Sequence, residues 1–147
     1  MNTLEMAKSY VIEAERRVRV AELMIKEGAY AYCIRQAQEA VELLLKAALR
    51  LVGIEPPKWH DVGPILVQFS ERFPDWFKSE IPVLAAISRW LSRERGPSMY
   101  GDEEAGIPPS RLYTEPYAVK AIEAAKYAYA LVKRLVEEVE AGARGAS

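Results

Sequence analysis

Apolar residues repeat every seven positions at the start of the chain, and this repeat restricts the fold more than any other feature of the sequence. The large residues of the repeat are Leu4, Val11, Val18 and Ile25. Small residues occupy the intermediate positions, at Ala7, Ala14, Ala21 and Gly28. Both sets share one face of a helix, so the spacing predicts a packed α-helix over residues 3 to 27. The small side chains on this face allow another helix to approach closely.

A second helix is predicted to begin near Ala29 and to end where Gly53 and Pro56-Pro57 interrupt the pattern. Its apolar face carries Cys33, Ala37, Ala40, Leu44, Ala48 and Leu51. Because the connection at Gly28 is so short, the first two helices are expected to pack antiparallel. The opposite face of this helix is charged and is most simply interpreted as solvent-exposed. Its residues are Arg35, Glu39, Glu42, Lys46 and Arg50.

The rest of the chain predicts further helices separated by one long loop. Two short helices fall within residues 61 to 95, with a break around Phe73-Pro74. Residues 96 to 113 contain three glycines, three prolines and three adjacent acidic residues, which favour a loop. Thr114 and Pro116 mark the start of a last helix.

No segment has the pattern of a β-strand. The chain is therefore predicted to be all-α, as an up-and-down four-helix-type bundle with an extra short helix. Its 147 residues suit one domain that spans residues 1–147. The tail, residues 141–147, is expected to be disordered.

Charge and composition exclude several classes of protein. Twenty Lys and Arg against 21 Asp and Glu give a net charge of −1, so no overall field attracts nucleic acid or an anionic membrane. The single cysteine, Cys33, excludes an internal disulfide and a cysteine zinc site. No apolar run reaches the roughly 20 residues of a membrane span, and we expect a cytoplasmic protein. Asparagine and glutamine are scarce, as is typical of proteins from a thermophile.

The segment from Ala31 to Phe69 resembles a signature of the HEPN family, the higher eukaryotes and prokaryotes nucleotide-binding domains. The signature reads approximately Gln-x-Ala-x-Glu, then Lys-Ala, then a histidine in the following loop. The matching residues here are Gln38, Ala40, Glu42, Lys46, Ala47 and His60. The resemblance implies an up-and-down helical bundle, in agreement with the periodicity.

The resemblance also implies two activities. Many HEPN proteins are metal-independent ribonucleases, with an arginine followed after four to six residues by a histidine. Others are inactive or nucleotide-binding partners of a minimal nucleotidyltransferase, as in toxin-antitoxin pairs. When Arg95 is aligned with the arginine, Tyr100 takes the place of the histidine, and Arg111 is likewise followed by Tyr117.

A phenol with a pKa of about 10 is almost fully protonated at neutral pH and makes a poor base. We therefore expect a non-catalytic domain that forms a homodimer through its long apolar helices. The resemblance alone implies the partner, a nucleotidyltransferase, and the ligand, ATP or another nucleotide. No metal or other cofactor is expected.

Five residues are predicted to bind the nucleotide or its phosphate: Arg89, Arg93, Arg95, Arg111 and Tyr113. Guanidinium groups bind phosphate through forked pairs of donors. The alternative is that these arginines complement the dipole at a helix C-terminus and bury their stems. The acidic run from Asp102 to Glu104 is interpreted as a solvated loop and not as a metal site.

His60 has two interpretations. It is either a hydrogen-bonded structural residue packed against Trp59, or a catalytic group in an alternative in which the chain is a ribonuclease. In that alternative Arg95 holds the scissile phosphate, and Tyr100 or His60 transfers the proton. A third alternative is a plain homo-oligomerisation module without a ligand.

Overall fold

The computed structural model describes residues 3–145, which fold almost entirely into helices. The α-helices are α1 (Thr3–Met24), α2 (Tyr30–Leu51), α3 (Gly63–Gln68), α4 (Asp75–Lys78), α5 (Ile81–Arg93), α6 (Arg95–Tyr100), α7 (Pro109–Leu112) and α8 (Glu115–Gly145). Two 3-10 turns, η1 (Ile25–Glu27) and η2 (Ser70–Arg72), complete the set. Over residues 3–145 no strand forms, and the prediction of an all-α fold is confirmed.

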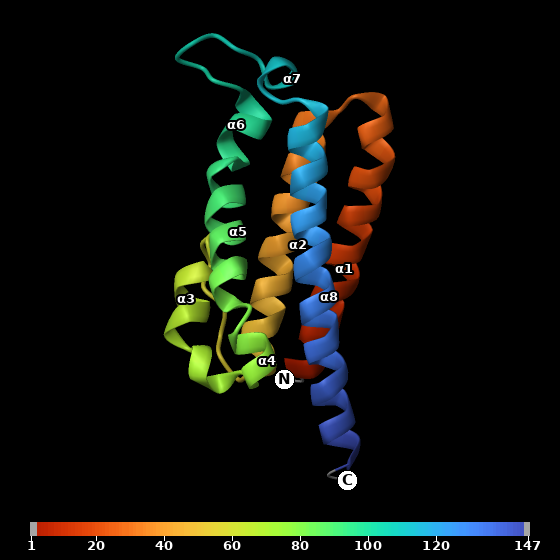
Figure 1. Cartoon of the computed structure of the whole chain (residues 1–147), viewed down its shortest axis with the longest axis vertical. Coiled ribbons are helices and arrows are strands. Elements are labelled where there is room, and N and C mark those ends of the chain that lie inside the picture. Colours follow the sequence, from red (N-terminus) through yellow and green to blue (C-terminus); the bar gives the residue numbers. More distant parts are fainter. Residues whose placement is uncertain (1–2, 146–147) are drawn as a thin grey trace.

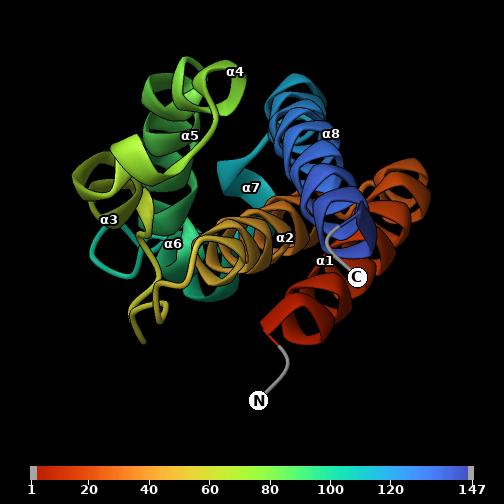
Figure 2. The same ribbon diagram turned by 90° about the horizontal axis from the view of Figure 1, so that it is seen from below.

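The long helices α1, α2, α5 and α8 run alternately up and down along the long axis of the molecule (Figure 1). Seen along that axis, α2 lies at the centre, with α1 and α8 on one side and α3 and α5 on the other (Figure 2). The expected up-and-down bundle is therefore present. The central position of α2 explains why the adjacent residues Leu44 and Leu45 are both fully buried, because the helix packs against neighbours on both sides.

Small side chains let α1, α2 and α8 approach closely. The buried residues of α1 are Ala7, Val11, Ala14, Val18 and Ala21. The last helix adds the fully buried residues Ala118, Ala121, Ala125 and Ala128. Between α1 and α2, Gly28 adopts a positive φ of 74°, and this left-handed residue reverses the chain as expected.

Residues 96–113 do not form the single loop that their composition predicted. They contain α6 and α7, joined by a turn that an isolated antiparallel bridge closes. Pro97 and Pro109 are tolerated because they lie in the first turns of these helices, where a missing N–H breaks no helical hydrogen bond. Gly101 ends α6 with φ 79° and ψ −164°, a conformation that is essentially restricted to glycine.

Two other boundaries differ from the prediction. Residues 61–95 fold as α3, η2, α4 and α5, with the predicted break present at Phe73-Pro74. The last helix continues through Gly145, although Gly142 and Gly145 have low intrinsic helix propensity. Most of the predicted disordered tail is thus helical, and residues 146–147 lie outside the described range. No helix between Thr3 and Gly145 has the length and apolar character to cross a membrane.

Candidate functional site

The charged face of α2 is not the solvent-exposed surface that the sequence predicted. The side chains of Arg35, Glu42 and Lys46 are only 17, 16 and 15% exposed. They are covered because α1, the loop after α2 and the start of α6 each contribute a polar residue to this face. The helix therefore has a second face that is partly buried, is polar and lies against its own set of neighbours.

Glu42 is the centre of this polar face. Its carboxylate accepts hydrogen bonds from Gln38 Nε2 at 3.0 Å and from Lys46 Nζ at 3.0 Å. His60 Nδ1 lies 2.8 Å from Oε1, and Arg95 Nη1 lies 3.7 Å from the same oxygen. Burial alone would raise the pKa of Glu42, but the hydrogen bonds from Gln38, Lys46 and His60 outweigh it and lower the pKa. Glu42 is thus a fixed anion at neutral pH.

Gln38 connects Glu42 to Arg95. Its side chain is buried, and its Oε1 accepts a 2.6 Å hydrogen bond from Arg95 Nη1 while its Nε2 donates to Glu42. The amide of glutamine can donate from its nitrogen and accept at its oxygen in this way. Gln38 therefore sets the position of the Arg95 guanidinium at the first residue of α6.

Arg35 and Glu39 form the other half of the cluster. Arg35 Nε donates to Glu39 Oε1 at 3.0 Å, and Arg35 Nη1 donates to the carbonyl oxygen of Arg95 at 2.8 Å. From α1, Arg17 Nη1 reaches Glu39 Oε2 at 2.5 Å. Arg35 thus holds the backbone of Arg95, whereas Gln38 holds its side chain.

These groups surround a pocket of about 300 Å³, here called the cationic pocket. Its lining residues are Arg17, Glu39, Glu42, Leu43, His60 and Arg95. Together with Arg35 and Lys46, which bind the same carboxylates, the cluster holds four permanent cations around two carboxylates. The excess of two positive charges, before any charge on His60, suits an anionic ligand.

His60 supplies the imidazole of the cluster, whose two ring nitrogens can each donate or accept a hydrogen bond. Its ring is half exposed, with Nδ1 against Glu42. A carboxylate at this position favours the tautomer that carries its proton on Nδ1, which leaves Nε2 as an acceptor. His60 is thus hydrogen-bonded, as one interpretation expected, but by Glu42 in a pocket that also contains Arg95.

The structure does not bring the five predicted phosphate-binding residues together. Arg95 lines the cationic pocket, whereas Arg89, Arg93 and Arg111 are exposed and form no ion pair within residues 3–145. Tyr113 instead donates to Glu94 at 2.9 Å.

Glu94 is the centre of a separate network of aromatic side chains. It accepts hydrogen bonds from the phenols of Tyr113 and Tyr117, and Trp90 Nε1 donates to the Tyr117 oxygen at 2.9 Å. Burial first, and then the hydrogen bond to Glu94, raise the pKa of both phenols. These tyrosines therefore stay protonated and connect α5 to the start of α8.

Tyr100 does not lie with Arg95. The two residues are the last and the first of α6, and five helical steps of about 100° place their side chains roughly 140° apart around the axis. The Tyr100 side chain is 66% exposed and does not line the cationic pocket. Of the three catalytic candidates, the structure thus brings together Arg95 and His60.

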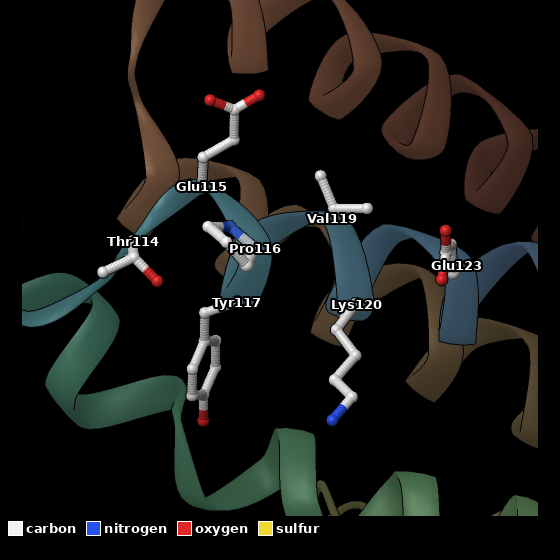
Figure 3. A pocket seen from close by; sticks show the side chains of 7 residues that line it. All are labelled: Thr114, Glu115, Pro116, Tyr117, Val119, Lys120 and Glu123. Carbon is white, nitrogen blue, oxygen red and sulfur yellow. The ribbon is translucent and has the colours of Figure 1, made fainter.

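A larger pocket on the surface is lined by a single segment of the chain. Figure 3 shows this pocket of about 610 Å³ at the N-terminal end of α8, where every lining residue belongs to the continuous segment 114–123. Tyr117 and Lys120 point away from Glu115 in this view (Figure 3). No residue from a second element converges on it, so we do not consider it the functional site.

Arg17, Arg35 and Glu39 were not predicted to be members of the site. Arg35 and Glu39 are four residues apart on a helix and so lie on the same face, but that face was assigned to solvent. Arg17 lies three residues after Ala14 and four residues before Ala21, which are both buried. This spacing places Arg17 beside the buried face of α1. That position is the signal that could have identified it.

Comparison with known proteins agrees with the fold. The sequence model of the HEPN domain family matches residues 7–138 of the chain. This range includes every residue of the cationic pocket. The crystal structure of TT1696 from Thermus thermophilus is similar, with a TM-score of 0.73 and 24% sequence identity. The similarity covers 92% of this chain and 99% of that one. At this identity the likeness shows a shared fold. No curated protein matches the chain.

Proposed function

The chain belongs to the HEPN family, and from this premise we propose that its cationic pocket binds the phosphate of a nucleotide-containing ligand without cleaving it. The observation that carries the proposal is the convergence of Arg17, Arg35, Lys46 and Arg95 on only two carboxylates. Guanidinium and ammonium groups that exceed the local carboxylates bind phosphate readily, and arginine adds directional donors.

The pocket lacks a complete set of groups for metal-free RNA cleavage. Cleavage requires a base for the 2′-hydroxyl and an acid for the leaving oxygen. His60 can fill one of these roles, but Glu42 is held as an anion by its hydrogen bonds and cannot supply a proton near neutral pH. Tyr100 lies outside the pocket. These positions support a binding role.

Calorimetric titration with ATP and with inorganic phosphate tests the proposal. We expect Arg95→Ala to weaken binding of both by about 10- to 100-fold, as loss of a charge-assisted contact predicts. Arg89→Ala is the matched control, because Arg89 is an exposed arginine outside the pocket. Arg95→Lys keeps a charge and shows whether any loss reflects misfolding. Equal affinity for the wild type and Arg95→Ala would contradict the proposal.

Ribonuclease activity is a second candidate, and the pairing of His60 with Glu42 favours it. A carboxylate that orients an imidazole through Nδ1 leaves Nε2 ready to accept a proton. In this alternative Arg95 holds the scissile phosphate and His60 takes the 2′-hydroxyl proton, while the 2′-oxygen attacks the phosphorus. The bond to the 5′-oxygen breaks, that oxygen takes a proton from solvent water, and a 2′,3′-cyclic phosphate is left. A fluorescent RNA substrate in EDTA decides the point: cleavage that His60→Ala abolishes would replace the binding role with catalysis.

The resemblance that led to the family also supports a homodimer and a nucleotidyltransferase partner. Measurement of the mass in solution, alone and with a co-purified nucleotidyltransferase, tests both. We expect a dimer that retains the transferase, and a strict monomer that binds no transferase would exclude this part of the proposal.

A further inference from the structure

Trp59 differs from the other two tryptophans of the chain. Trp76 Nε1 donates to Glu138 at 2.9 Å, and Trp90 Nε1 donates to Tyr117 at 2.9 Å, so both indoles are packed and partnered. Trp59 is 59% exposed, and its N–H makes no hydrogen bond within the described range. Aromatic side chains supply large buried area when a fold uses them. An exposed and unpartnered indole is therefore not explained by packing.

The position of Trp59 links it to the cationic pocket. It directly precedes His60, whose ring is held against Glu42 at 2.8 Å. On the other side of His60, Asp61 Oδ1 accepts from Ser88 Oγ at 2.8 Å and from the Gly63 amide at 3.1 Å. The loop is thus fastened immediately after Trp59. Consecutive Cα atoms are about 3.8 Å apart, so the backbone of Trp59 lies next to that of His60, which lines the pocket.

We propose that Trp59 is the stacking platform for a nucleobase whose phosphate occupies the cationic pocket. The proposal rests on the phosphate-binding function and assigns the ligand's base to a residue outside the pocket. An indole face stacks on any base, so the shared chemistry is a base joined to a phosphate. That chemistry occurs in a free nucleotide and in a single-stranded nucleic acid, and the experiment separates the two sources.

Binding of three probes to the full chain tests the proposal: inorganic phosphate, adenosine 5′-monophosphate and a single-stranded oligoadenylate of ten nucleotides. We expect Trp59→Ala to weaken the adenosine 5′-monophosphate or the oligoadenylate complex by about five- to a hundred-fold, the range for loss of one base stack. Affinity for inorganic phosphate should stay unchanged. Trp59→Phe keeps an aromatic face and should recover much of the loss.

Leu23→Ala is the matched control, because Leu23 is a large apolar residue that is 64% exposed on α1 and does not line the pocket. Quenching of the tryptophan fluorescence by the two base-containing probes, absent with phosphate and lost in Trp59→Ala, is a second readout. A preference for the oligoadenylate would identify a strand as the source, and equal affinities would identify a free nucleotide.

The failures of the two proposals are distinguishable. If Arg95→Ala weakens all three probes while Trp59→Ala changes none, the pocket binds phosphate and the stacking role is wrong. If inorganic phosphate and both base-containing probes fail to bind the wild type, the phosphate-binding function is wrong. The stacking role is then wrong as well, because it depends on that function.

Discussion

His60 Nδ1 lies 2.8 Å from Glu42 Oε1, which joins the loop after α2 to the polar face of that helix. The same carboxylate oxygen lies 3.7 Å from the guanidinium of Arg95, at the start of α6. One anion thus holds the histidine and the arginine that the sequence separates by 35 positions. Because the family signature lies on α2, its acidic residue organises groups from two other parts of the chain.

Acid stability should depend on Glu42. Its hydrogen bonds lower the pKa in the folded protein, so the unfolded chain binds the proton first as the pH falls. The stabilisation is present above the unfolded value of about 4.5 and is lost as the pH falls through the lower folded pKa. We expect urea unfolding of Glu42→Gln to show a weaker loss of stability below that pH than the wild type. Glu103→Gln is the exposed control, and identical acid dependence in the wild type and Glu42→Gln would contradict this account.

Gln38→Glu should destabilise the protein, because it removes the Nε2 donor and puts a second acid against Glu42. Loss of a hydrogen bond to a buried charge costs about 1–3 kcal/mol. The matched control is Gln68→Glu on the exposed surface of α3, for which we expect less than about 0.5 kcal/mol. Chemical unfolding measures both, and equal stabilities of the two variants would show that the amide of Gln38 is not needed.

The turn between α6 and α7 should tolerate alanine at Gly106 better than at Gly101. A Cβ on Gly101 would lie 2.2 Å from the carbonyl oxygen of Ile107, whereas one on Gly106 meets nothing within 4 Å. Both residues have positive φ, so each variant pays about 1 kcal/mol of backbone strain. We expect Gly101→Ala to cost at least about 2 kcal/mol more by thermal unfolding, since backbone must move. Similar melting temperatures of the two variants would contradict the turn geometry.

The folded protein should lose stability in alkali as Tyr129 loses its proton. Burial and its hydrogen bond to Glu15 raise the pKa of Tyr129 to about 12, so the folded protein holds this proton more tightly than the unfolded chain. The stabilisation is present below about pH 10 and is lost between that value and about pH 12. Tyr129→Phe should therefore lose less stability over this range than Tyr32→Phe, the exposed control. The opposite order would show that the phenol does not connect α8 to α1.

The periodicity predicted the long helices because the spacing of apolar residues along the chain determines which face of a helix can be buried. The four signature residues Gln38, Glu42, Lys46 and His60 do lie together. The first three share one face of α2, and the loop that follows the helix is short enough to return His60 to that face. The contribution of Arg17 depends on how α1 packs against α2, which no local pattern specifies.

The polar face of α2 was misread for a physical reason. Charged residues at helical spacing look the same in sequence whether they face water or a second set of charges. Whether this face meets water or other charges depends on α6, because Arg95 at its start covers the face. The glycines and prolines of residues 96–113 concealed that helix, because the prolines were read as interruptions and not as first-turn residues.

The most direct test of the central claim uses the single histidine of the chain, which gives one unambiguous imidazole signal. Addition of inorganic phosphate to the folded protein should shift the proton resonances of His60 in a saturable way. The shift should persist in Arg89→Ala and disappear in Arg95→Ala. If phosphate leaves the His60 resonances unchanged in the wild type, or shifts them equally in Arg95→Ala, the pocket is not a phosphate site.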